Sequence, residues 1–383
     1  MAKCYCAYRF LLLALGFAFI YIQMRLLATQ PEYPTYPLAT AVPVAAVVIM
    51  ACNRADYLER TINSILKHQR AVALQYPLFV SQDGTDQIVK NKALSYDQLT
   101  YMQHLDDEPV KTERPGELIA YYKIARHYKW ALDQLFNRHN FSRVIILEDD
   151  MEIAPDFFDY FEAAAALLES DKSIMAVSSW NDNGQKQFVQ DPYVLYRSDF
   201  FPGLGWMLSK SIWEELSPKW PKAYWDDWLR LKENHKGRQF IRPEVCRTYN
   251  FGEHGSSFGQ FFKQYLEPIK LNDVQVDWKS MDLSYLMEDK YVLHFANMVR
   301  RAQPVYGAEA VLKEYNIDGD VRIMYEDPPD FEQIARSFGI FEEWKDGVPR
   351  TAYKGVVVFR YQTRRRVFLV GPESLQQLGI EHA

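Results

Sequence analysis

The sequence VIILEDD at residues 144–150 indicates how the chain folds and where its chemistry lies. Four consecutive aliphatic residues predict a short strand that is buried on both faces, as in a parallel sheet covered by helices. The three carboxylates that follow fall at the carboxyl end of this strand, where open α/β sheets bind their ligands. Residues 148–150 are therefore the first candidates for a functional site.

Similar apolar runs alternate with helical patterns on both sides of this stretch. Further strands are predicted at residues 44–51, 77–81, 99–104 and 174–178. Amphipathic helices are predicted at 56–68 and 118–136, and another helix opens at Pro155. This alternation predicts an α/β fold, with a Rossmann-like parallel or mixed sheet and helices on both faces.

The pattern changes near residue 290. Strands are predicted at 321–325, 356–361 and 366–370, with one helix at 331–338. We therefore expect a catalytic domain over residues 44–287 and a small C-terminal α+β domain over residues 288–383.

The N-terminus carries a membrane signal. Residues 10–22 contain no charge, and Lys3 and Arg9 precede them. We expect a short transmembrane anchor at 10–28, with residues 1–9 in the cytosol and the rest of the chain in the lumen. A cleaved signal peptide and a buried core helix are the alternatives. Residues 29–43, rich in Pro, Tyr, Thr and Ala, would form a short stem.

Composition narrows the classes of function. The 383 residues carry a net charge of −6 and no long basic block, which argues against nucleic acid as a partner. The four cysteines and eight histidines show no zinc-binding spacing. Any metal is therefore expected to bind oxygen ligands.

The acidic run at 148–150 suggests such a metal. Neighbouring carboxylates raise each other's pKa unless a cation compensates them, and a divalent ion such as Mn²⁺ or Mg²⁺ suits oxygen ligands. One alternative is an acidic helix N-terminus. A Walker B strand is the other, but the chain has no P-loop.

Other candidates follow the strands or cluster with aromatic residues. Arg54 follows the first strand and suits either a phosphate or the solvent, and Asp83 ends the second strand. His127 lies beside the apolar stripe of its helix, where a hydrogen-bonded boundary histidine is the favoured interpretation. The motif Trp225-Asp226-Asp227-Trp228 suits a sugar site or an ordinary helix start, because indole faces stack on pyranoses and a carboxylate can act as a general base.

One motif indicates a different function. Residues 255–259 (GSSFG) fit the G-x-S-x-G pattern of serine esterases with the α/β-hydrolase fold, and Asp277 and His294 follow Ser257 in the order of a triad. That motif needs a buried strand before it, and residues 249–254 make a poor one. A flexible loop that closes over a ligand explains the glycines better.

Several long motifs together resemble the N-acetylglucosaminyltransferase I family, and its plant members most. They occur in the family's order: MACNR (50–54), SQD (81–83), YYKIARHYKWAL (121–132), ILEDD (146–150), APDFFDYFE (154–162), WNDNG (180–184), YRSDFFPGLGW (196–206) and PKWPKAYWDDW (218–228). The resemblance covers nearly all of residues 44–383.

The resemblance implies a GT-A glycosyltransferase fold and a single-pass type II Golgi membrane enzyme. It implies UDP-N-acetylglucosamine as donor, Mn²⁺ as cofactor and inversion at the anomeric carbon. The implied acceptor is a high-mannose N-glycan with five mannoses on a glycoprotein. The new β1,2 bond would form on its α1,3-arm mannose, which starts hybrid and complex N-glycans.

The resemblance also implies roles for individual residues. Among them Asp226 is the general base, and Ser257 lies in a loop, 252–260, that orders over the donor phosphates. The remaining matches are Asp150 as metal ligand, Asp149 for the ribose, Glu148 for the transferred sugar, Asp83 and His127 for the uracil, Arg54 for the nucleotide and Trp225 for the donor pocket.

The sequence departs from the family in two respects. Animal members carry disulfides, whereas Gly84, Ala176 and Phe240 stand where cysteines would align, which leaves Cys52 unpaired. The stem is also shorter than is usual for such enzymes.

Overall fold

The computed structural model describes residues 42–256, 258–313, 319–362 and 364–380, and residues 43–383 form one compact unit. The expected tail and anchor, and all of the expected stem except residues 42 and 43, lie outside the described residues. Within the described ranges, no helix combines the length and the apolar character that crossing a bilayer requires.

The main sheet has eight strands in the order β3-β2-β1-β4-β8-β6-β9-β7. The strands span β1 Ala46–Ala51, β2 Leu78–Asp83, β3 Leu99–His104, β4 Arg143–Glu148, β6 Ile174–Ser178, β7 Leu195–Ser198, β8 Trp206–Ser209 and β9 Gln239–Pro243. Strands β3, β2, β1 and β4 are parallel, whereas β8 is antiparallel to both β4 and β6. The predicted mixed α/β sheet is confirmed.

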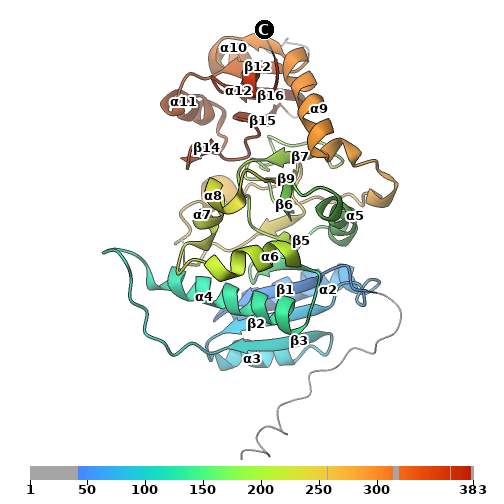
Figure 1. Cartoon of the computed structure of the whole chain (residues 1–383), viewed down its shortest axis with the longest axis vertical. Helices are drawn as coiled ribbons and strands as arrows, with labels where there is room; N and C mark the ends of the chain where they lie inside the picture. Colours follow the sequence, from blue (N-terminus) through green and yellow to red (C-terminus); the bar gives the residue numbers. More distant parts are fainter. Residues whose placement is uncertain (1–41, 257, 314–318, 363, 381–383) are drawn as a thin grey trace, which may run out of the picture. The chain divides into compact units, whose positions relative to one another are not determined.

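Helices cover both faces of this sheet (Figure 1). Along β1, Val47, Ile49 and Ala51 join the hydrophobic cluster that includes α2, α3 and α5. The alternating Ala46 and Val48 join a second cluster with α4 and α6. The helices span α2 Ala55–Gln69, α3 Gln87–Leu94, α4 Ile119–Asp133, α5 Phe157–Ser170, α6 Lys210–Leu216, α7 Trp225–Arg230 and α8 Lys232–His235.

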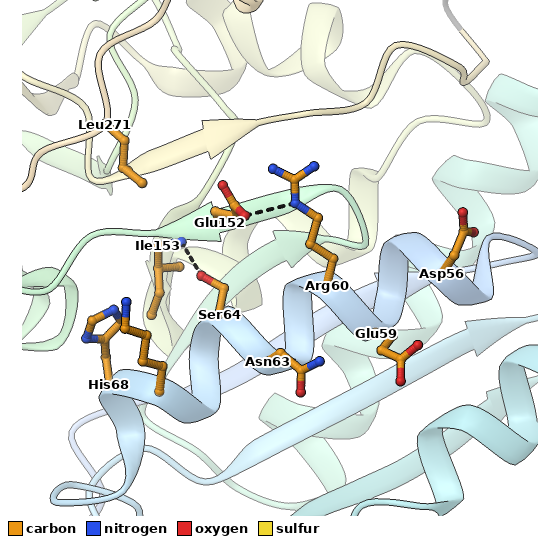
Figure 2. A pocket seen from close by; sticks show the side chains of 10 residues that line it. Asp56, Glu59, Arg60, Asn63, Ser64, His68, Glu152, Ile153 and Leu271 are labelled. Carbon is orange, nitrogen blue, oxygen red and sulfur yellow. Dashed lines mark hydrogen bonds and ion pairs between the residues drawn. The ribbon is translucent and has the colours of Figure 1, made fainter.

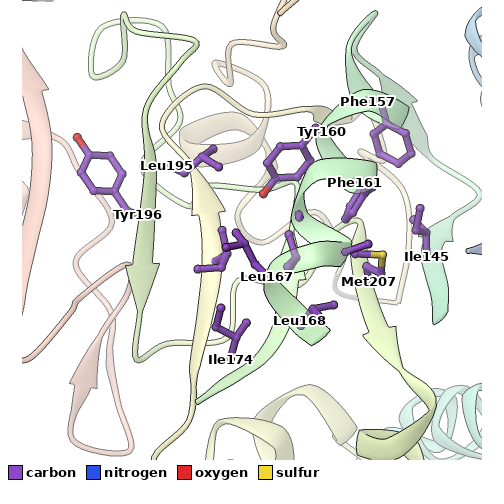
Figure 3. Close-up of a cluster of buried hydrophobic side chains, with 14 of the residues drawn as sticks. Ile145, Phe157, Tyr160, Phe161, Leu167, Leu168, Ile174, Leu195, Tyr196 and Met207 are labelled. Atoms are coloured by element: carbon purple, nitrogen blue, oxygen red, sulfur yellow. The ribbon is translucent and has the colours of Figure 1, made fainter. Parts of the chain in front are cut away.

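Predicted and observed helices agree closely. The helix predicted at 56–68 is α2, and the one predicted at 118–136 is α4, which continues as a π-helical turn, η1 (Gln134–Arg138). Helix α5 buries aromatic and aliphatic side chains against β6 and its neighbours, as Figure 3 shows for Tyr160, Phe161 and Leu168. Burying a side chain of this size contributes about 1.5 to 3 kcal/mol each, so α5 fixes the middle of the sheet firmly.

The segments between β9 and the C-terminal part are short and irregular. Strand β10 pairs antiparallel with β5, directly after the acidic run. The bounds are β5 Met151–Ile153, β10 Thr248–Asn250, and the short helices η3 Phe262–Leu266, η4 Trp278–Ser280 and η5 Ser284–Leu286. A further short helix, η2 Ser217–Lys219, follows α6.

The C-terminal part contains a second sheet, in the order β11-β12-β16-β15, with its own hydrophobic cluster. All three predicted strands and the predicted helix occur there, and α9, β11, α10, β13, β14 and α12 are additional. The bounds are α9 Glu288–Arg301, β11 Gln303–Val305, α10 Gly307–Lys313, β12 Val321–Met324, α11 Pro328–Phe338, β13 Trp344–Lys345, β14 Val348–Pro349, β15 Val356–Tyr361, β16 Arg365–Val370 and α12 Ser374–Gln377. A domain boundary at residues 287/288 stays a prediction.

Candidate active site

Four parallel strands deliver polar residues to one edge of the main sheet. Strand β2 ends at Asp83, β3 at His104 and β4 at Glu148, and the segment after β1 leads to Arg54 at the start of α2. The pairing register sets Asp83 opposite His104 and Met50 opposite Glu148. The strand-end argument from the sequence therefore located this edge correctly.

Arg54 binds the turn between β4 and β5. Its Nη2 contacts Asp149 Oδ1 and lies 2.9 Å from Asp150 Oδ2, while Nη1 donates to the carbonyl oxygen of His254 at 2.8 Å. The Asp149 and Asp150 side chains are only 4% and 8% exposed. Arg54 thus compensates part of the carboxylate repulsion that the sequence predicted.

The acidic run keeps an unfavourable excess of negative charge. Burial raises the pKa of Asp149 to about 6, although Arg54 opposes the shift. Burial and then the Asp150 charge raise the pKa of Glu148 to about 7, and burial also raises the pKa of Asp150. Three carboxylates face one guanidinium, so an additional cation would stabilise the ionised site.

The residues present fit a divalent cation held by few protein ligands. No cluster of three or more His, Cys, Asp or Glu side chains in the described ranges could hold a metal alone. Asp150 Oδ1 accepts a hydrogen bond from Asn250 Nδ2 at 3.0 Å, and Oδ2 contacts Arg54. Oxygen ligands and uncompensated charge suit Mn²⁺ or Mg²⁺ that completes its coordination with ligand phosphates and water.

A second group of residues surrounds Asp83. His104 Nδ1 lies 2.8 Å from Asp83 Oδ1, and the His104 ring is stacked on His127 at 5.6 Å and 12°. His127 Nε2 lies 2.8 Å from Ser81 Oγ, and burial lowers the pKa of His127 to about 4, so that ring is neutral at pH 7. The structure therefore brings Asp83 and His127 together through His104, which the sequence analysis did not single out.

Glu148 connects the acidic run to an aromatic wall. Tyr128 donates its hydroxyl to Glu148 Oε1 at 2.8 Å, and its ring is stacked on Trp225 at 4.5 Å. Trp225 also stacks on Trp206 and Trp220, with ring centroids 5.6 and 5.8 Å away. Trp225 is buried, so these contacts fix the start of α7 beside Glu148.

The two aspartates of α7 have different partners. Asp227 Oδ1 accepts from Arg230 Nη1 at 2.7 Å and also contacts Lys345 of the β13–β14 hairpin. Among the described residues, Asp226 has one hydrogen-bonding partner, Arg230, at 3.1 Å, and its side chain is 41% exposed. Burial, and then the charge of Asp226, raise the pKa of the Tyr121 hydroxyl. Asp226 is therefore the more available carboxylate, and Lys345 is a partner that sequence reasoning missed.

The loop after β10 lies against Arg54 and Asp150. A Cβ atom on Gly252 would lie 2.1 Å from Asp150 Oδ2, so only glycine fits there. Ser257 lies outside the described residues. The strand before the G-x-S-x-G motif is a three-residue antiparallel one, which is not the buried strand that a nucleophile elbow requires, so nothing supports the esterase alternative.

One pocket of the described structure lies away from this edge. It has a volume of about 650 Å³ and runs along the outer face of α2 beside β5 (Figure 2). Charged residues such as Glu59, Arg60 and Glu152 line it, and it contains none of the predicted site residues. The carboxylate edge of the sheet is therefore the better candidate for chemistry.

Cys52 is exposed and Cys246 is buried, and both are free thiols. Within the described residues, Cys52 therefore forms no disulfide with Cys246.

Comparisons with known proteins show which family the chain belongs to. A curated relative, the alpha-1,3-mannosyl-glycoprotein 2-beta-N-acetylglucosaminyltransferase of Arabidopsis thaliana, is 64% identical over 445 residues, covering all of both chains. Among solved structures, the Pyrobaculum calidifontis mannosyltransferase PcManGT with GDP-Man and Mn²⁺ has a TM-score of 0.35 at 18% identity, covering 60% of this chain and 63% of that chain. S. aureus TarS 1–349 with UDP-GlcNAc has a TM-score of 0.36 at 13% identity, covering 68% and 67%. These two structural likenesses are too distant to support a conclusion.

The family model described as "GNT-I family" matches residues 20–382, nearly the whole chain. The resemblance seen in the sequence motifs is confirmed, and the chain belongs to the GNT-I family.

Proposed function

We propose that this chain transfers N-acetylglucosamine from UDP-N-acetylglucosamine to the α1,3-arm mannose of a five-mannose N-glycan, in β1,2 linkage and with inversion. The observation that carries the proposal is a buried acidic run whose Glu148 is hydrogen-bonded to Tyr128, which stacks on Trp225, the neighbour on α7 of the half-exposed carboxylate Asp226. The name of the Arabidopsis relative, 64% identical, states the same sugar and acceptor linkage.

The donor would bind along the strand edge. Asp83 and His127 would contact the uracil, Asp149 the ribose, and Arg54 the nucleotide. Glu148 and Trp225, which Tyr128 links, would contact the transferred sugar. Asp150 would hold Mn²⁺, which when bound supplies charge neutralisation for the departing diphosphate.

Asp226 would act on the acceptor as general base. The reaction needs a carboxylate that can take a proton from the mannose hydroxyl as this hydroxyl attacks the anomeric carbon. Asp227 has two cationic partners, whereas Asp226 has one and is more exposed. One displacement from the face opposite the leaving UDP then inverts the configuration.

The loop at 252–260 would close over the donor phosphates and exclude water, with Ser257 as one phosphate contact. Arg54 already binds the carbonyl of His254 within this loop. We propose in addition that the fold is of the GT-A type. The chain would be held in the Golgi membrane by an anchor at 10–28.

The test is a transfer assay on the full chain in detergent. We expect the five-mannose glycan to gain the mass of one N-acetylhexosamine with UDP-N-acetylglucosamine and Mn²⁺, and no mass with GDP-mannose. A glycan that lacks the α1,3-arm mannose should remain unchanged. Release of free sugar without a glycan product would contradict the proposal.

A further inference from the structure

His104 occupies the end of β3, directly opposite Asp83 on β2. Its Nδ1 lies 2.8 Å from Asp83 Oδ1. An ionised carboxylate can only accept hydrogen bonds, so His104 Nδ1 carries the proton and donates it. Asp83 Oδ2 has no hydrogen-bond partner from the described part of the chain, and the Asp83 side chain is 16% exposed.

The His104 ring packs against two aromatic neighbours. It lies parallel to the His127 ring, and the ring of Trp130 lies 5.2 Å away on α4. The His104 side chain is only 11% exposed, so its rotamer is fixed by packing. Because the His104 ring is held in place, its hydrogen bond also holds the Asp83 carboxylate in one orientation.

We propose that His104 is a positioning residue for the nucleobase subsite, where it orients Asp83 so that Oδ2 accepts the imide N–H of a uracil ring. This inference rests on the proposed function, because it assigns a residue to the donor site of that reaction. It also predicts selectivity for uracil, since cytosine has no hydrogen on N3 and would leave Asp83 Oδ2 unpaired. Sites that accept a specific N–H reject analogues without it strongly.

A packing role for His104 makes a different prediction. If only the ring mattered, Phe would replace it well and Asn poorly. If orientation of Asp83 matters, Asn should replace it well, because the Asn side-chain amide can donate from nearly the position of Nδ1. Phe keeps an aromatic face but donates nothing.

The experiment titrates UDP and CDP into the full chain in detergent with Mn²⁺ and follows the heat of binding. We expect His104→Phe to weaken UDP binding by about ten- to a hundredfold, the value of a hydrogen bond to a charged group. CDP binding should change little, so the preference for UDP over CDP shrinks. His104→Asn should retain UDP binding within a few fold. His68→Phe, on the outer face of α2, is the matched control and should bind as the wild type does.

A double-mutant cycle separates positioning from packing. In an Asp83→Ala background, His104→Phe should change UDP binding by less than about twofold, because the carboxylate that His104 orients is absent. If His104→Phe fails to unfold cooperatively, His104→Ala takes its place and His104→Asn should again restore binding.

Three results would overturn the inference. If His104→Phe binds UDP as the wild type does, the inference is wrong and the proposed function is unaffected. The same holds if His104→Phe weakens UDP binding as much in the Asp83→Ala background as it does in the wild type. A wild-type chain that binds UDP no better than CDP would overturn both the inference and the uracil site of the proposed function.

Discussion

The two groups of carboxylates in this molecule are built in opposite ways. Asp149 and Asp150 are almost fully buried, share one arginine and have raised pKa values. Asp226 and Asp227 are 41% and 34% exposed and contact two cations, Arg230 and Lys345. A further cation would stabilise the ionised form of the buried group, whereas the charges of the exposed group are already balanced by Arg230 and Lys345. The buried group is therefore suited to binding a charged ligand, and the exposed group is suited to transferring a proton.

The largest expected effect comes from breaking the buried group. Asp150→Ala should reduce transfer to background, because it removes the carboxylate expected to hold Mn²⁺. EDTA should have the same effect on the wild type, and product mass measures both. Glu152→Ala is the control, because Glu152 lies two residues after Asp150 but is partly exposed and pairs with Arg60. Transfer that survives both Asp150→Ala and EDTA would contradict the metal assignment.

The next effect tests the exposed group. Asp226→Asn should lower kcat by about 10²- to 10⁴-fold, the usual contribution of a general base. Calorimetric titration should find UDP-N-acetylglucosamine binding unchanged, because Asp226 has no place in the proposed donor site.

Asp227→Asn is the matched control for Asp226, one residue away on the same helix. Its side chain already contacts Arg230 and Lys345, so kcat should fall much less. If only Asp227→Asn loses activity, the base is Asp227. If neither does, the reaction proceeds without either aspartate.

The pH dependence of the unfolding free energy tests the buried group in the absence of any ligand. Burial raises the pKa of Glu148 from 4.5 to about 7, so the folded state binds a proton that the unfolded state releases. The protonated Glu148 therefore supports the fold fully below about pH 4.5, and that support is lost as the pH rises through 7. In EDTA, Glu148→Gln should match the wild type near pH 4.5 and exceed its unfolding free energy by on the order of 2 kcal/mol at pH 8. Urea unfolding at both pH values measures this, and a gap that narrows with rising pH would have the wrong sign.

The smallest effect concerns the ion pair between Lys345 of the β13–β14 hairpin and Asp227 of α7. Lys345→Met should lower the unfolding free energy by no more than about 1 kcal/mol, because the pair is partly exposed and Asp227 keeps Arg230. Lys313→Met removes an exposed pair with Glu309 and should change it still less. A loss above about 3 kcal/mol for Lys345→Met, measured by urea unfolding, would mean that Arg230 does not compensate Asp227.

The sequence predicted the strand edge because the position where each strand ends is local information. Buried runs ending in Arg54, Asp83 or residues 148–150 can be recognised within a window of ten residues, and parallel pairing then brings their ends together. The same argument could have found His104, since the strand predicted at 99–104 ends there.

Other parts of the site could not be predicted in this way. Lys345 lies 118 residues from Asp227, and no periodicity relates the two. The role of Tyr128 was also hidden, because its position suits the apolar stripe of α4 as well as a hydrogen bond to Glu148. Contacts between distant side chains depend on packing that a local pattern does not encode.

The close approach of Gly252 to Asp150 has a consequence for engineering the loop. A library that varies the loop can change residues 253 to 256 while the backbone stays in place, but any side chain at 252 must displace the Asp150 carboxylate. Deep mutational scanning should therefore find residue 252 intolerant to every replacement, alanine included. The change from intolerant to tolerant positions would fall between codons 252 and 253, and it would show that contact with the Asp150 carboxylate sets the constraint.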